Sequence, residues 1–349
     1  LGVGGMGVVV SARHLKLDEV VAIKFLHPQA SLDAQAVLRF SREARAAVKI
    51  KSEHVARVID IATLPNGAPY MVMEFLRGRD LGAVVHEAGP LPVVEAVDCV
   101  LEACEAVAEA HQLGIVHRDL KPANLFVARR PDGTPLIKVL DFGISKISDG
   151  SGAAGSMTRT SAIMGSPLYM SPEQMASSRD VDARTDIWAL GVILHEALTG
   201  QVPFEGVTLP ELCLKVLNMP APPLRGFRPE VPQAVEAAVL RCLEKDRTRR
   251  FSTIADFAAA LAPHGTARGA LSYDRIVRLG GGTTAGHSTV PGATRTSGAP
   301  ARSTDAAWGN TSSADKRHGR RGPLSVWMAA LGTVVFIVPM VVVVLRMWS

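Results

Sequence analysis

Cysteine is scarce in this sequence, and its spacing does not suit cross-links. The 349-residue chain has four cysteines, Cys99, Cys104, Cys213 and Cys242, and no CxxC pair. A small disulfide-stabilised secreted domain or a zinc ribbon needs denser or more regular cysteines. The pattern is typical of a protein in a reducing cytosol, with thiols that fill core positions.

A strong net charge and an apolar signal-peptide run at the start are also absent from this sequence. The formal net charge is only +5, with much of the basic excess near the C-terminus, so no nucleic-acid partner is predicted. No apolar signal-peptide run opens the chain, and nothing at its start predicts secretion. A hydrophobic content of 47% is enough for a large core, which predicts a globular protein with an appendage.

The hydrophobic pattern divides the chain into two lobes of one α+β domain. Residues 1–76 combine short β-branched runs with one helical stretch at 37–48, which predicts a small β-rich N-lobe. Residues 77–262 are mostly helical in pattern, with long apolar-periodic segments at 93–111 and 187–198. We therefore expect a larger helical C-lobe.

The C-terminal part has a different composition. Residues 263–323 are rich in Gly, Ser, Thr, Ala and Arg, with almost no large apolar residue after Leu279, which predicts a disordered tether. Residues 324–345 are apolar throughout and would form a helix of roughly 33 Å, against a hydrocarbon core of about 30 Å. We expect one transmembrane helix here and a short tail at 346–349.

Basic residues set the expected orientation of this helix. Lys316, Arg317, Arg320 and Arg321 precede it, and only Arg346 follows it. The positive-inside bias then predicts a single-pass protein of the cell (inner) membrane, with the folded domain in the cytoplasm.

Four motifs that serve phosphoryl transfer follow one another in the N-terminal half. They are a Gly-rich turn at 2–7, VAIK at 21–24, HRDLKPAN at 117–124 and DFG at 141–143. A lone glycine motif is a weak signal, but four in this order and spacing describe one site. Together they predict transfer of the γ-phosphate of ATP onto a hydroxyl.

The first two motifs and the next helix predict a phosphate-binding site. Backbone N–H groups at a turn built from Gly2, Gly4, Gly5 and Gly7 can approach a polyphosphate closely, and Val9 then covers a base. Lys24 reaches the α and β phosphates and needs a carboxylate to hold it. Glu43 is the candidate because its helical spacing from Phe40 and Ala47 directs it inward, whereas Glu43 by itself would be taken for a solvated residue.

The later motifs supply the groups for the transfer itself. Asp119 accepts or orients the proton of the attacking hydroxyl, and Lys121 neutralises charge on the moving phosphoryl group. Asn124 and Asp141 offer oxygen atoms, the ligands that Mg²⁺ prefers. ATP and Mg²⁺ are therefore the expected cofactors.

On these motifs the sequence resembles the eukaryotic-type (Hanks-type) protein kinases, and in particular the bacterial membrane-attached serine/threonine kinases. Residues 170–173 (MSPE) resemble the family's APE element, residues 186–191 its DxWxxG helix, and Arg250 its late partner for Glu173. Lys121 and the Gly-Ser-Pro at 165–167 resemble the serine/threonine branch, although Ser166 stands where the family usually has threonine.

The resemblance implies a two-lobed kinase fold over residues 1–262, protein substrates with Ser or Thr acceptors, and a homodimer for trans-autophosphorylation. It also implies residues around the adenine of ATP, namely Met73 as gatekeeper, the hinge residues Glu74, Phe75 and Leu76, and Ala22 and Leu125. The regulatory residues that it implies are Thr158 and Thr160 as autophosphorylation sites, Arg118 as the phosphate partner, and Ser166.

Two alternatives remain open beside an active kinase. A pseudokinase that acts as a nucleotide-binding scaffold would be supported by loss of Lys24, Asp119 or Asp141, but all three are present. A small-molecule phosphotransferase would lack the APE-like and DxWxxG elements. Because the chain opens directly at the Gly-rich turn, we also expect the first strand to be missing and the turn to be poorly ordered.

Overall fold

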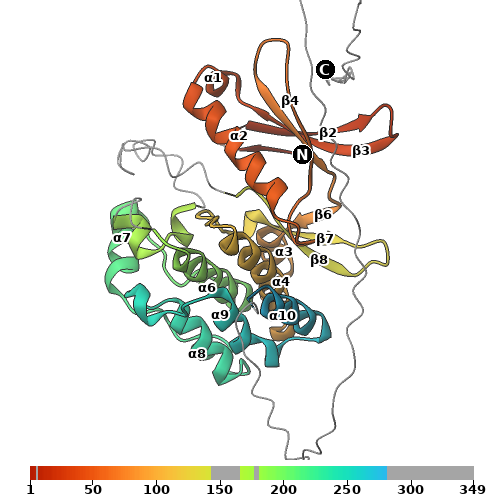
Figure 1. Cartoon of the computed structure of the whole chain (residues 1–349). Coiled ribbons are helices and arrows are strands. Elements are labelled where there is room, and N and C mark those ends of the chain that lie inside the picture. The colour runs from red at the N-terminus through yellow and green to blue at the C-terminus, as the bar shows by residue number, and fades with distance from the viewer. Residues whose placement is uncertain (5–6, 143–165, 177–180, 281–349) are drawn as a thin grey trace, which may run out of the picture. The chain divides into compact units, whose positions relative to one another are not determined.

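The computed structural model describes residues 1–4, 7–142, 166–176 and 181–280, and it has the two lobes that the sequence predicts. The small lobe is an antiparallel sheet with a long helix beside it, and the larger lobe is mainly helical (Figure 1). The α+β prediction is confirmed.

The sheet of the small lobe has five strands in the order β1-β2-β3-β5-β4. The strands are β1 (Gly2–Gly4), β2 (Gly7–His14), β3 (Glu19–Leu26), β4 (Val58–Thr63) and β5 (Pro69–Glu74). A short strand is present where the first strand was expected to be missing, since Gly2–Gly4 pairs with β2 in the register Gly2↔Val9. Pairing satisfies backbone groups of β2 that would otherwise lack partners.

Helices α1 (Pro28–Ser31) and α2 (Ala34–Lys49) follow β3. The Asp33 side chain caps α2 by accepting a hydrogen bond from Gln35 N at 2.9 Å. Phe40 and Ala44, one turn apart on α2, lie in an apolar cluster with Met71 of β5. This packing turns the face that also carries Glu43 towards the sheet.

The larger lobe contains a small sheet of three strands and most of the helices. Its elements are β6 (Gly78–Asp80), α3 (Leu81–Ala88), α4 (Val93–Gln112), η1 (Pro122–Asn124), β7 (Leu125–Arg129), β8 (Pro135–Val139), η3 (Ser166–Tyr169), α5 (Pro172–Ala176), α6 (Arg184–Thr199), α7 (Leu209–Asn218), η4 (Leu224–Gly226), α8 (Gln233–Cys242), η5 (Arg247–Arg249), α9 (Ile254–Leu261), η6 (Ala262–His264) and α10 (Ala267–Gly280). Most residues of α4 and α6 are buried, so these two helices form the centre of the core. Cys99, Cys104 and Cys242 fill core positions, as predicted.

The start of the expected disordered tether is corrected. Residues 263–280 continue the folded domain through η6 and α10, and Ser272 and Ile276 are buried. Gly265 and Gly269 let this segment approach α4 closely. A Cβ on Gly265 would lie 2.7 Å from Asp98 Oδ1, and a Cβ on Gly269 would lie 2.4 Å from it. A composition rich in small residues here reflects close packing rather than disorder.

The predicted transmembrane segment at 324–345 lies outside the described residues, as does the rest of the tether from 281 on. None of the helices within the described ranges is both long and apolar enough to cross a membrane.

Candidate active site

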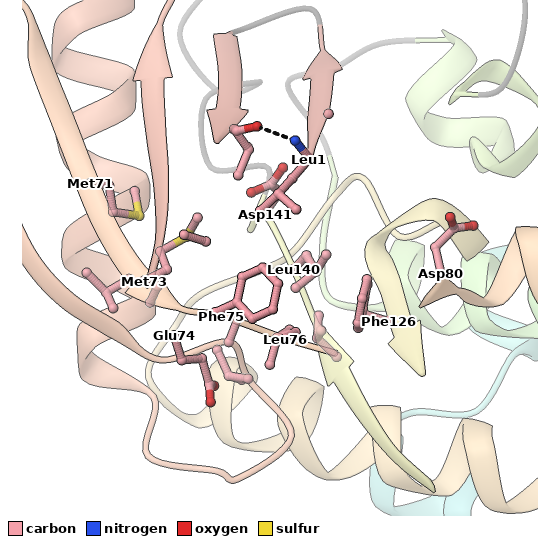
Figure 2. A pocket seen from close by; sticks show the side chains of 18 of the residues that line it. Leu1, Met71, Met73, Glu74, Phe75, Leu76, Asp80, Phe126, Leu140 and Asp141 are labelled. Atoms are coloured by element: carbon pink, nitrogen blue, oxygen red, sulfur yellow. Dashed lines mark hydrogen bonds between the residues drawn. The ribbon is translucent and has the colours of Figure 1, made fainter. Parts of the chain in front are cut away.

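A cavity of about 520 Å³ is lined by residues of both lobes (Figure 2). The predicted nucleotide-binding residues that line it are Gly2, Val9, Ala22, Glu74, Leu76 and Asp141. Gly4 ends β1 and Gly7 begins β2, where a Cβ on Gly7 would come within 1.8 Å of Phe25 O, so only glycine fits. Gly5 lies outside the described residues. The size and mostly apolar lining suit a flat aromatic ring.

Leu125 is not where the sequence placed it. Leu125 is fully buried in the core of the larger lobe, whereas its neighbour Phe126 lines the cavity. Successive residues of a strand point to opposite faces, so an error of one position exchanges a core residue for a site residue.

Glu74, a predicted hinge residue, lines the cavity, and its carboxylate is engaged by two hydrogen bonds. Glu74 Oε1 accepts hydrogen bonds from Lys138 Nζ and from Arg57 N, both at 2.7 Å. Lys138 on β8 is buried, and no sequence pattern had singled it out. The pair joins the hinge to the strand that leads to Asp141.

The predicted partnership of Lys24 and Glu43 is present. Lys24 Nζ lies 2.7 Å from Glu43 Oε1 and 2.7 Å from Asp141 Oδ1. Burial by itself would lower the pKa of Lys24, but the Asp141 and Glu43 carboxylates outweigh it and raise this pKa. Lys24 is therefore a fixed positive charge at the edge of the cavity.

This cluster has two carboxylates for one ammonium group, a composition that suits a cation. Burial raises the pKa of Glu43, and the nearby Asp141 charge adds to this effect. The side chain of Asp141 is half exposed. The Asn124 amide nitrogen donates to Asp119 O at 2.8 Å, which leaves its oxygen as the atom suited to a metal. Oxygen donors of this kind fit Mg²⁺ completed by phosphates and water.

The loop at 117–124 brings the remaining catalytic candidates together. Lys121 Nζ lies 3.2 Å from Asp119 Oδ2, and both side chains are mostly buried. Arg118 and Asp141 have φ values of 65° and 47°, in the left-handed region that non-glycine residues rarely adopt. Such strained residues are found at sites whose geometry the surrounding structure enforces.

Asp186 on α6 enforces that geometry. Its buried carboxylate accepts hydrogen bonds from His117 N at 2.8 Å and Arg118 N at 2.9 Å, and pairs with His111 Nε2 at 2.7 Å. Burial would raise the pKa of Asp186, but the His111 contact outweighs it and holds this pKa below its usual range. The DxWxxG pattern marked Asp186 without indicating this role, and His111 had no sequence signal.

His117 joins the loop to the DFG segment. It is fully buried, its Nε2 lies 3.0 Å from Leu140 O, and its ring lies 4.7 Å from that of Phe142. Burial lowers the pKa of His117, which favours its neutral form, and the ring serves as a structural link.

Glu173 and Arg250 pair as predicted. The guanidinium donates from Nη1 and Nη2 to the two carboxylate oxygens at 2.7 and 2.8 Å. This bidentate pair fixes the segment that follows η3 to the core.

The regulatory candidates are described only in part. Thr158 and Thr160 lie outside the described residues, and Ser166 begins η3. Arg118 donates weakly from Nη2 to Val181 O at 3.5 Å, and its buried Nε has no hydrogen-bond acceptor among the described residues. A guanidinium with a buried, unused donor is suited to an anionic partner.

Comparison with known proteins agrees with this geometry. A family model described as "Protein kinase domain" matches residues 1–262. The chain is 41% identical over 261 residues to serine/threonine-protein kinase Pkn1 of Myxococcus xanthus, covering 75% of this chain and 37% of Pkn1. It is 40% identical over 266 residues to serine/threonine-protein kinase PknB of Mycobacterium tuberculosis, covering 75% and 41%. The chain spans less than half the length of these relatives.

A solved structure shares the fold. The crystal structure of the Mycobacterium tuberculosis PknI kinase domain has a TM-score of 0.57 and 27% identity, covering 76% of this chain and 93% of that domain.

Proposed function

Because the chain belongs to the protein kinase domain family, we propose that it is an ATP- and Mg²⁺-dependent protein serine/threonine kinase. The observation that carries this proposal is Lys24 Nζ, held at 2.7 Å by both Glu43 and Asp141 beside an adenine-sized cavity. A nucleotide-binding scaffold could use this lysine as well, but it would have no need for the transfer residues Asp119 and Lys121, whose side chains lie 3.2 Å apart.

Each residue of the site has a defined task in this reaction. Lys24 binds the α and β phosphates, and Asn124 and Asp141 would hold Mg²⁺, which neutralises charge on the phosphates. Asp119 orients the acceptor hydroxyl and takes its proton, while Lys121, close to Asp119, offsets negative charge on the transferred group. The acceptor is a Ser or Thr of a protein, as the names of the relatives indicate for those proteins.

We expect the wild-type chain to phosphorylate itself on Thr158 and Thr160. Each phosphate adds about −1.5 to −2 charges, which the unused donors of Arg118 can bind, so activity should rise as the sites fill. Incubation of purified full-length chain with Mg²⁺ and radiolabelled ATP, followed by peptide mapping, measures this. A rate per molecule that increases with protein concentration indicates transfer between two copies.

Lys24→Met is the matched control, since it removes the buried charge and keeps an unbranched side chain. It should carry no label on either threonine or on an added basic protein. The wild-type chain could also bind Mg²⁺ and ATP but transfer no phosphate to itself or to the added protein. That result would replace the proposed kinase function with that of a nucleotide-binding scaffold.

We further propose that residues 324–345 anchor the kinase domain to the cytoplasmic side of a membrane. Two features support this proposal, namely the apolar run and the basic residues before it. Each basic residue contributes about 1 kcal/mol of binding free energy at an anionic leaflet. The full-length chain should sediment with membranes, and a chain that ends at Gly280 should stay in the supernatant. Ending at Gly280 keeps α10, which belongs to the folded domain. Equal partitioning of the two chains would contradict the anchor.

A further inference from the structure

The central helix α4 presents buried acidic residues at helical spacing on one face. Asp98, Glu102 and Glu105 are 2%, 1% and 5% exposed. A buried carboxylate is costly unless hydrogen bonds or opposite charges compensate it. Since no lysine or arginine of α4 lies on this face, the compensation must come from elsewhere in the chain.

Helix α10 and the turn before it supply much of this compensation. Thr266 donates to Asp98 from its backbone N at 2.9 Å and from its hydroxyl at 2.5 Å. Arg268 Nε lies 2.9 Å from Glu102 Oε1. Arg275, two turns further along α10, lies 3.4 Å from Glu105 Oε1. Ion pairs, as well as burial of the Ile276 side chain, therefore hold α10 against α4.

Arg275 also reaches beyond α4 to the loop that follows α2. Its Nη1 forms an ion pair with Glu53, which is also paired with Arg130 at 2.9 Å. These two arginines outweigh burial and lower the pKa of Glu53 to about 2. The next residue, His54, places Nε2 3.4 Å from Glu105 Oε2. Residues 51–54 are thus attached to α4 and α10 together.

This loop is connected to both carboxylates that hold Lys24. On one side it continues directly from α2, the helix that carries Glu43. On the other side it binds the end of β8, where Val139 N donates to His54 O at 2.7 Å and Ala56 N donates to Val139 O at 3.2 Å. Val139 leads through Leu140 to Asp141. A shift of the loop would move Glu43 and Asp141 relative to Lys24.

We propose that Arg275 is a positioning residue for the Lys24–Glu43–Asp141 cluster, and that α10 couples the segment after the kinase domain to the nucleotide site. The inference rests on the proposed function, since it assigns a role in ATP binding. α10 begins after the end of the family match at residue 262, so Arg275 lies outside the matched kinase domain.

Coupling between two sites acts equally in both directions. This gives a test that separates a coupled helix from one that only stabilises the fold. If docked α10 favours the arrangement that binds nucleotide, nucleotide must favour docked α10 by the same factor. We expect Mg²⁺ with a non-hydrolysable ATP analogue to slow amide hydrogen exchange in residues 270–280 of the full-length chain, although these residues do not line the cavity.

Variants at the Arg275–Glu53 contact should break this link. Arg275→Ala and Glu53→Gln should each weaken binding of the analogue about fivefold, the lower end of typical coupling, and abolish the slowing of exchange in α10. The double variant should lose less than the sum of the two single ones, because both remove the Arg275–Glu53 contact, although each also loses a further pair, with Glu105 or with Arg130. Arg275→Lys, which keeps the charge, should recover part of the affinity. Arg278→Ala is the control, since it removes an exposed arginine from the same helix.

Exchange in α10 that does not respond to nucleotide, or equal weakening of binding by Arg275→Ala and Arg278→Ala, overturns the proposal. If Arg275→Ala unfolds the chain, the wild-type exchange experiment still decides. Both readouts measure binding, so a wild-type chain that shows the coupling but transfers no phosphate would refute the kinase function alone.

Discussion

Asp119→Asn is expected to reduce phosphotransfer about 10²- to 10⁴-fold, the usual contribution of a general base, with the fold and nucleotide affinity preserved. The substitution keeps the shape of the side chain and removes its negative charge. The loop should stay in place, because Asn124 binds the backbone O of Asp119 and Asp186 binds the backbone N of His117 and Arg118. Only the group that faces the acceptor hydroxyl changes.

The measurement is the initial rate of label transfer from ATP to a basic protein, together with the dissociation constant of the ATP analogue. Asp60→Asn, an equal change at an exposed position on β4, serves as the control and should keep the wild-type rate. A rate for Asp119→Asn within a few-fold of wild type would exclude a catalytic role for this carboxylate.

Local spacing made much of the site predictable. Glu43 was expected to face inward from its spacing to Phe40 and Ala47 and from the need of Lys24 for a carboxylate, and it is buried against Lys24. The helix around it is short-range structure that follows from side-chain periodicity. The pairing of Arg250 with Glu173 is a long-range contact, and only the resemblance to kinases indicated it.

Two kinds of feature were not predicted. One is order that depends on partners far away in the sequence, and the other is the face of a strand to which a side chain points. Residues 267–280 contain many small and polar residues, and their order comes from Asp98, Glu102 and Glu105, which lie far away in the sequence. No local pattern reports such a partner. Leu125 was predicted to contact the nucleotide, but Phe126 lines the cavity instead. Neighbouring residues of a strand point to opposite faces, so an error of one position changes which side chain reaches the site.

Arg250→Ala is expected to lower the free energy of unfolding by about 3–5 kcal/mol, the usual cost of removing one partner from a buried ion pair. The Arg250 side chain is 0% exposed and that of Glu173 is 13% exposed. Besides Glu173, Arg250 donates to Glu244 O at 2.8 Å and lies over the Trp188 ring at 4.9 Å. The substitution leaves a cavity and a carboxylate without its partner in the core.

Urea unfolding of the chain that ends at Gly280 measures the loss, and Arg249→Ala is the matched control because that side chain is 68% exposed. The size of the loss should depend on pH. Burial would raise the pKa of Glu173, but Arg250 outweighs it and holds this pKa low, so in the wild type the pair is stabilising above the unfolded pKa of about 4.3. As the pH falls from neutral towards the folded pKa, Glu173 takes up a proton, first in the variant and then in the wild type. The difference between the two chains should therefore narrow on acidification. A difference below about 1 kcal/mol at neutral pH, or one that does not change with pH, would mean that desolvation cancels the attraction within the pair.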